Sequence, residues 1–205
     1  MLSGLFEKGL ENFLIVFGDP YPGYRLEDYD FMKAEDLIRA IRSKFDGRPR
    51  PCLGAVTNQY ALDRDQEIDR TLSKIEAGAD YIVTNSAFED YFVLEYIDDL
   101  RSRGLSVPVF VQLSIPYGLN NLLFVSKRFD IPVPERVKEI VSLNPLGGGV
   151  HLIAQAYDGL CNEVNGIHFS YLFRSRNPIP IYTHLLDMIE TDGQLTISLQ
   201  ATLRQ

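Results

Sequence analysis

The chain has 205 residues, of which 45% are hydrophobic and 23% charged, and its formal net charge is −8. This composition is typical of a globular domain, and the acidic balance, without a basic stripe, argues against a nucleic-acid-binding protein. No apolar run reaches the roughly 20 residues of a membrane-spanning helix, and the Met1–Phe17 region lacks the basic flank and cleavage site of a signal peptide.

The predicted strands are short apolar runs that lead into polar or glycine residues. In chain order they are Phe13–Phe17, Cys52–Val56, Tyr81–Val83, Val107–Leu113 and Gly166–Leu172. Amphipathic segments of helical length separate the first four runs, at 31–45, 64–77 and 88–103. Strand and helix therefore alternate, which predicts an α/β fold with a parallel sheet and right-handed crossovers. Polar residues at the carboxyl end of such a strand face the ligand site, so we expect Thr84 and Asn85 to face a ligand.

The number of strands bears on the architecture. Five parallel strands fit an open doubly wound sheet or part of a (β/α)8 TIM-type barrel, whose complete form needs about 250 residues. Leu2–Asn12 has the character of a helix end running into a strand, as if the chain began inside the architecture. We therefore expect a partial barrel of about five βα units over residues 1–190. In the tail, 191–205, apolar and polar residues alternate over Leu195–Leu203, which predicts an edge strand or assembly segment.

Motifs for several other kinds of site do not occur in the sequence. Gly147–Gly149 does not follow a predicted strand, so it is weak evidence for a nucleotide-binding loop, and there is no nucleophile elbow and no histidine cluster for a metal. His168 lies within an apolar run, where a core histidine is commoner than a catalytic base. Cys52 and Cys161 have no neighbours at metal-ligand spacing, so we expect reduced thiols in a cytoplasmic protein.

Three stretches, in this order and at plausible spacing, resemble the methylenetetrahydrofolate reductase family. They are Phe17-Gly18-Asp19-Pro20, Lys74 with Ala77–Asn85, and Gly166–Phe169 with Leu172 and Arg174. The resemblance extends to about Glu190 and implies the part of that family's barrel from the fourth strand onward. It also implies an activity: a nicotinamide reduces FAD, and the flavin reduces methylenetetrahydrofolate to methyltetrahydrofolate.

The resemblance implies four residues on the flavin side. Gly18 and Asp19 match a glycine–aspartate pair beside the flavin, where a fixed carboxylate would stabilise the cation that develops on the folate. An Asp-Pro turn or a helix cap explains Asp19 equally well from its residue type alone. Glu67 and Lys74 match positions that contact the phosphates and ribityl chain of the flavin, with a solvated helix lysine as the commoner alternative for Lys74.

Three further residues are expected on the substrate side. Asn85 stands where the family has a glutamine that contacts the pterin, so the amide is kept on a shorter side chain; an asparagine that merely starts a loop is the alternative. Gln112 lies in the fourth predicted strand, and we expect it to bind substrate. Arg174 follows the last predicted strand, where it can bind a carboxylate or phosphate in a bidentate manner or lie at the surface.

Departures from the family pattern leave two interpretations open. Thr57-Asn58 stands where the family has a tyrosine-proline-glutamate-like stretch, Ser86-Ala87 replaces an aromatic pair, and the family's first-strand acidic residue has no counterpart. The first interpretation is a flavin-dependent reductase component that uses a folate and a nicotinamide donor. It would need the family's N-terminal barrel units, which another polypeptide supplies or which were lost from the sequence. The second is a non-catalytic folate- or pterin-binding or assembly subunit. Under either interpretation, the open edges of the sheet predict a homo-oligomer or a complex with a complementary chain. The composition and the missing motifs predict no metal and no nucleic-acid or membrane partner.

Overall fold

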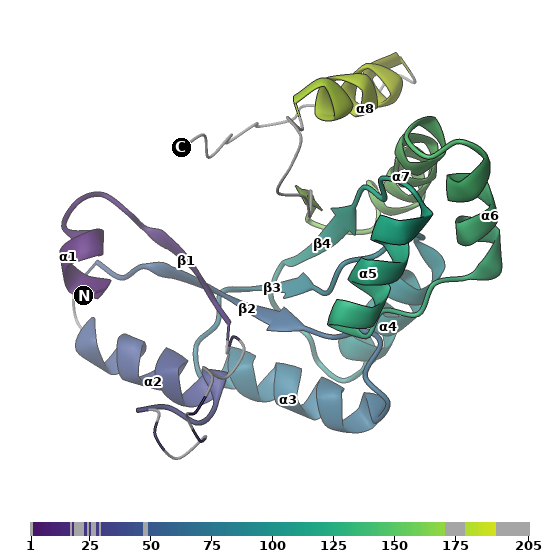
Figure 1. Cartoon of the computed structure of the whole chain (residues 1–205). Helices are drawn as coiled ribbons and strands as arrows, with labels where there is room; N and C mark the ends of the chain where they lie inside the picture. Colours follow the sequence, from purple (N-terminus) through teal and green to yellow (C-terminus); the bar gives the residue numbers. More distant parts are fainter. Residues whose placement is uncertain are drawn as a thin grey trace.

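The fold is built on a five-stranded parallel sheet whose strand order equals the sequence order, β1-β2-β3-β4-β5 (Figure 1). The computed structural model describes residues 2–16, 18, 23, 25, 28, 30–46, 49–170 and 179–191. The strands are β1 (Asn12–Ile15), β2 (Cys52–Thr57), β3 (Tyr81–Thr84), β4 (Val109–Ser114) and β5 (Gly166–Ser170). Neighbouring strands in sequence are also neighbours in space, as in a barrel, so the sheet forms a half-barrel.

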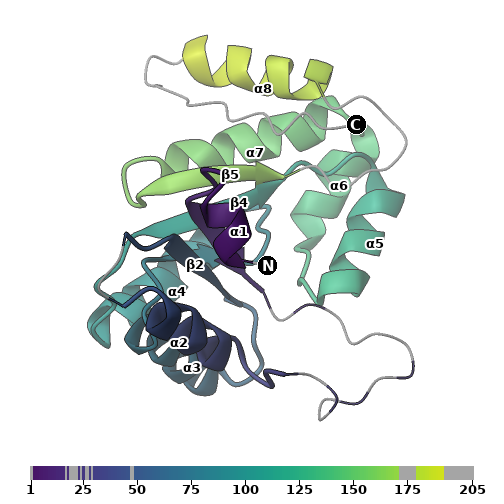
Figure 2. The same cartoon turned by 90° about the vertical axis from the view of Figure 1, so that its left-hand side faces the viewer.

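Helices separate the strands, and those that pack on the sheet lie on one side of it. They are α1 (Leu2–Phe6), α2 (Ala34–Lys44), α3 (Arg64–Glu76), α4 (Tyr91–Ser102), α5 (Leu119–Phe129), α6 (Glu135–Leu143), α7 (Gly147–Leu160) and α8 (Ile179–Thr191). The three helices expected from the amphipathic pattern are confirmed as α2, α3 and α4. α8 packs against α7, where it buries Ile181, Leu185 and Ile189, and Figure 2 shows it lying over α7.

The two faces of the sheet differ in burial. Side chains that point to the helices, such as Leu53, Ile82 and Val111, are fully buried. On the other, concave face, Leu14 is 43% exposed, and Val16 just beyond the strand is 54% exposed. Strand side chains alternate between faces, so this pattern follows directly from the sequence. None of the described helices is long and apolar enough to cross a membrane.

Glycines on the concave face provide space for aromatic rings on the neighbouring strands. Gly54 pairs with Tyr81 in the sheet register, and a Cβ atom at Gly54 would lie 2.2 Å from the Tyr81 ring. Phe110 occupies the equivalent position over Gly166. The Tyr81 and Phe110 rings meet edge to face with their centroids 5.4 Å apart. The rings of Tyr81 and Phe110 thus lie on the concave face because their partners on the adjacent strands, Gly54 and Gly166, lack side chains.

The amino-terminal ends of β2 and β3 are joined by charged groups. Arg42 on α2 donates from Nε to the Gly78 carbonyl at 2.8 Å and from Nη1 to the Pro51 carbonyl at 2.7 Å. Its Nη2 forms an ion pair with Asp80, whose Oδ2 also accepts the Leu53 backbone N–H at 2.8 Å. One arginine therefore connects α2 to the starts of two strands. We call this group the Arg42 staple.

Some expected elements lie outside the described residues. The edge strand expected within 195–203 belongs to them, as do the last two residues of the run Gly166–Leu172. The boundary at residue 190 stays a prediction, and α8 continues to Thr191. Both cysteines are partly buried free thiols, as expected.

Candidate functional site

The carboxyl ends of β2 and β3 are joined by amide side chains. Gln59 donates from Nε2 to the Asn85 carbonyl at 2.8 Å and accepts the Asn85 backbone N–H at Oε1 at 2.9 Å. The Asn85 side chain donates to Asn58 Oδ1 at 3.2 Å and accepts the Ser86 backbone N–H at 2.7 Å. Gln59 therefore fixes the backbone of the loop after β3, and Asn85 lies at the end of the sheet where the sequence predicts it.

Serine hydroxyls continue this polar edge across β4 and β5. The Ser114 hydroxyl donates to Ser86 Oγ at 2.7 Å and is also hydrogen-bonded to Ser170. The Gln112 side chain donates from Nε2 to Ser86 Oγ. The carboxyl ends of four strands therefore carry one continuous row of neutral polar groups, which we call the rim: Asn58, Gln59, Asn85, Ser86, Gln112, Ser114 and Ser170.

Ionisable side chains beside the rim are shifted toward their neutral forms. His168 pairs with Gln112 in the β4–β5 register and is exposed, so it is not the core histidine expected from the sequence. Partial desolvation of the ring lowers the pKa of His168 below its usual value. Burial raises the pKa of Tyr60, which follows Gln59, to about 12. These two side chains beside the rim therefore favour their uncharged forms near neutral pH.

Lys74 and Glu67 lie inside the fold, beneath the end of β2. The Lys74 ammonium donates to the Val56 carbonyl at 2.8 Å and lies 3.9 Å from Glu67 Oε1, which in turn accepts the Asn58 backbone N–H at 3.1 Å. The Lys74 side chain is only 11% exposed, so the solvated-lysine alternative is wrong. Burial lowers the pKa of Lys74, and the Glu67 carboxylate opposes that shift. The pair supports the β2 end of the rim from below.

Two further predicted residues, Thr84 and Gly18, are not part of the rim. Thr84 does not face the rim surface: it is 2% exposed, accepts the Gln112 backbone N–H at 3.1 Å and donates to the Asn85 carbonyl at 3.0 Å. Gly18 is exposed with φ +72°, and among the described residues no atom lies within 4 Å of a Cβ built there. Asp19 and Arg174 lie outside the described residues, so their roles stay predictions.

Five rim residues were not among the predicted site residues: Asn58, Gln59, Ser86, Ser114 and Ser170. The alternation of strand side chains contained part of the signal, because Ser114 and Ser170 lie two residues after Gln112 and His168 on the same face. Gln59 follows its strand by two residues, and only the geometry of two loops brings it to Asn85. In the sequence, Ser86 stands out only as a departure from the family pattern, and nothing there indicates its hydrogen-bond partners.

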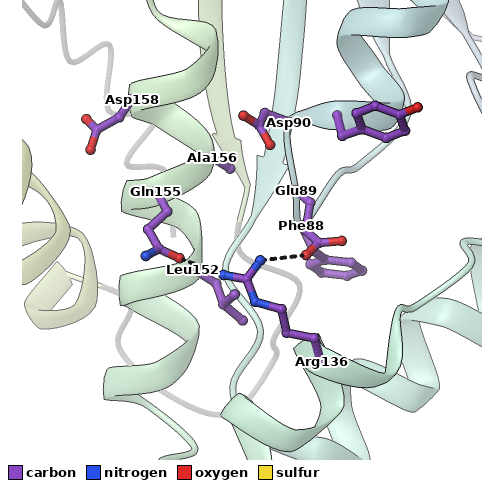
Figure 3. A pocket seen from close by; sticks show the side chains of 9 residues that line it. Phe88, Glu89, Asp90, Arg136, Leu152, Gln155, Ala156 and Asp158 are labelled. Carbon is purple, nitrogen blue, oxygen red and sulfur yellow. Dashed lines mark hydrogen bonds and ion pairs between the residues drawn. The ribbon is translucent and has the colours of Figure 1, made fainter.

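A separate cavity of about 470 Å³ lies between the start of α4 and helices α6 and α7 (Figure 3). Phe88, Leu152 and Ala156 give it an apolar part. In Figure 3, Arg136 lies between Glu89 and Gln155, 3.8 Å and 3.5 Å from their oxygens. The other lining residues are Asp90, Tyr91 and Asp158. None of the predicted site residues lines this cavity. The described residues contain no group of three or more metal-ligating side chains suited to an ion.

Comparison with known proteins identifies one family. A family model described as "Methylenetetrahydrofolate reductase" matches residues 1–185. Methylenetetrahydrofolate reductase 1 of Schizosaccharomyces pombe is 28% identical over 140 residues, which cover 65% of this chain and 23% of that protein. The probable methylenetetrahydrofolate reductase (NADPH) of Caenorhabditis elegans is 25% identical over 131 residues, with 63% and 20% covered. The chain thus spans between a fifth and a quarter of the length of these relatives.

A solved structure shares the fold. It is an uncharacterized protein from Clostridium thermocellum, described as binding two copies of 5-methyl-5,6,7,8-tetrahydrofolic acid. The TM-score is 0.54 and the sequence identity 20%, and the match covers 75% of this chain and 57% of that one. At this identity the likeness concerns the fold alone.

Proposed function

The chain belongs to the methylenetetrahydrofolate reductase family, and on this premise we propose that it binds a reduced folate at the rim. We further propose that it takes part in the FAD-dependent reduction of 5,10-methylenetetrahydrofolate to 5-methyltetrahydrofolate in the cytoplasm, with a nicotinamide as the electron donor.

The observation that carries this proposal is the rim. Neutral amides and hydroxyls gather at the carboxyl ends of the strands, which is where barrel folds bind their ligands. The pterin ring of a folate offers N–H, amino and carbonyl groups, which neutral partners can bind without the cost of desolvating a charge. The family relation supplies the ligand class, and the rim supplies groups of matching polarity.

Individual residues have distinct roles in this proposal. Asn85 makes one described hydrogen bond from Nδ2 and one at Oδ1, so each atom retains capacity for a pterin contact. Gln112 Oε1 accepts no hydrogen bond from the described residues, so it also has capacity for a pterin contact. Asp19 would hold a fixed negative charge beside the cation that develops on the folate, and it would stabilise that charge most in a water-poor site. Arg174 would bind a carboxylate of the folate tail.

The residues present fit the flavin in part. Gly18 leaves its backbone open to close approach, which suits a planar ring. The Lys74 ammonium lies at the proper end of β2 for a phosphate, but it donates to the Val56 carbonyl and lies near Glu67. Binding of the pyrophosphate would require Lys74 to turn away from Val56. When bound, FAD would supply the hydride-transfer chemistry.

The assembly state is part of the proposal. In the sheet as described, β1 and β5 are edge strands, and Leu14 and Val16 leave apolar surface on the concave face. Such edges favour association, so we expect a homo-oligomer or a complex with a complementary chain. Light scattering coupled to size exclusion measures this directly, and a monomer at micromolar concentration would count against it.

A second function is a non-catalytic folate- or pterin-binding or assembly subunit. The specific observation in its favour is the engagement of Lys74 and Glu67 within the fold, together with a serine at position 86 in place of an aromatic residue. Both features preserve a polar ligand site while weakening the flavin site.

Two titrations separate these functions. The purified protein is titrated with FAD, followed by visible absorbance, and with 5-methyltetrahydrofolate, followed by calorimetry. Saturable binding of both ligands, with folate binding weakened in Asn85→Ala, supports the reductase function. Folate binding without FAD binding supports the subunit function. Absence of folate binding contradicts the reductase function and a folate-binding subunit, and it leaves only the assembly subunit.

A further inference from the structure

The three serines of the rim form a chain of hydrogen bonds that is shielded from water. Ser114 and Ser170 are register partners at the ends of β4 and β5, and Ser86 follows β3. Ser86 and Ser114 are 2% and 3% exposed. Because water is largely excluded, each hydroxyl proton needs a partner in the protein or in a ligand.

Counting protons gives the chain a direction. A hydroxyl has one proton and two acceptor positions. Ser114 donates its proton to Ser86, so the bond between Ser170 and Ser114 must be donated by Ser170. Ser86 accepts from Ser114 and also from Gln112 Nε2, which uses both of its acceptor positions. The chain therefore runs from Ser170 to Ser114 to Ser86 and ends on the Ser86 proton.

The Ser86 proton and Gln112 Oε1 have no hydrogen-bond partner among the described residues, and Gln112 Nε2 keeps a second proton. The direct Gln112–Ser86 bond holds the two side chains together. A ligand edge with an N–H next to a C=O would satisfy the Gln112 acceptor and the Ser86 donor at once, whereas an edge of two adjacent donors would leave the Ser86 proton unpaired.

We propose that Ser86 and Gln112 form a specificity element that binds the lactam edge of a ring ligand, its N–H to Gln112 Oε1 and its C=O to the Ser86 hydroxyl. Ser114 and Ser170 are positioning residues that act through Ser86. The chain of hydroxyls polarises the terminal O–H, which strengthens its bond to the ligand carbonyl. This inference rests on the proposed folate function, because the 4-oxo pterin ring carries such an edge.

The test uses two probes that differ only at this edge, folic acid and 4-amino-4-deoxyfolic acid, in which an amino group replaces the ring carbonyl. We expect the wild-type chain to bind folic acid about tenfold more tightly, the size of one or two lost hydrogen bonds. In Ser86→Ala this preference should fall to about threefold or less. The matched control is Ser142→Ala, which removes an exposed hydroxyl on α6 and should leave the preference unchanged.

The ratio of the two affinities separates a binding role from a structural one. A Ser86→Ala chain that is merely less stable would bind both probes more weakly and keep the wild-type preference, which would overturn the proposal.

The experiment also distinguishes the inference from the function on which it rests. Wild-type binding of 5-methyltetrahydrofolate and folic acid, without discrimination against the 4-amino probe, overturns the specificity element and leaves folate binding intact. No binding of any folate overturns the proposed function.

Discussion

The two ends of the sheet are held by different chemistry. At the amino-terminal end, the Arg42 staple joins β2 and β3 through a guanidinium, a carboxylate and two backbone carbonyls. At the carboxyl end, the rim uses amides and hydroxyls, several of which have unused donors or acceptors. In barrel folds the first end serves stability and the second serves ligands. The difference shows how one sheet separates these tasks: charged groups are saturated where the structure must hold, and neutral groups are left incomplete where a ligand can bind.

The largest expected effect is at the staple. Asp80→Ala removes the acceptor of Arg42 and of the Leu53 N–H, and it leaves a guanidinium that is only 13% exposed without its anion. We expect a loss of about 2–4 kcal/mol in the free energy of unfolding, measured by urea denaturation. The control Asp98→Ala removes an exposed carboxylate on α4 and should cost under about 0.5 kcal/mol. Equal losses in the two variants would refute the special status of the staple.

A smaller loss of stability is expected from the scaffold of the rim. Gln59→Ala removes two hydrogen bonds that hold the Asn85 backbone, which should cost about 1–2 kcal/mol in unfolding free energy. Because Asn85 would then move, folate affinity should also fall. The comparison variant is Gln66→Ala, on the exposed side of α3, where neither quantity should change. A loss of affinity without a loss of stability would show that Gln59 contacts the ligand itself.

Binding should be separable from stability at Asn85. Asn85→Ala removes a partly buried amide whose partners are Asn58 and the adjacent Ser86 backbone N–H. We expect affinity for 5-methyltetrahydrofolate to fall about tenfold, measured by calorimetry, with a stability loss below about 1 kcal/mol. The opposite result, an unchanged affinity with a large loss in the free energy of unfolding, would mean that Asn85 supports the scaffold and does not contact the ligand.

The smallest expected effect concerns pH. The pKa of His168 is lowered in the folded protein, so the unfolded chain takes up its proton first as the pH falls below about 6.5. His168 therefore favours unfolding from about pH 6.5 down through its folded pKa, and above that range its contribution is constant. In His168→Gln the unfolding free energy should decline less steeply between pH 7 and pH 5. A slope in His168→Gln equal to that of the wild type would contradict this expectation.

Much of the half-barrel could be predicted from local patterns. Apolar runs such as Cys52–Val56 mark buried strands because both faces of a parallel strand are covered over most of its length. Apolar residues at three- and four-residue spacing mark α2, α3 and α4, because one face of each helix is buried. In contrast, α5 and α6 were not predicted, because Pro116, Pro134 and Pro145 divide that region into short pieces without a strand between them.

The site was predictable only where a polar residue lies in the carboxyl-terminal half of a strand or directly after it. Asn85 and Gln112 are in this class, because the carboxyl end of a strand leads to the rim whatever its neighbours are. The serine chain depends instead on the register that sets Ser114 beside Ser170, which is a property of two strands separated by more than 50 residues. The burial of Lys74 likewise depends on the Val56 carbonyl being within its reach, which its own helix does not encode.

The strand order of the sheet also has a consequence for how the chain folds. Because each strand pairs with the strand before it, every new βα unit finds its docking surface already formed by the preceding unit. Only β5 has to wait for a long intervening segment, which contains α5, α6 and α7. The other pairings close shorter loops at a lower entropic cost. The molecule can therefore assemble during synthesis on the ribosome, one unit at a time, from β1 toward β5.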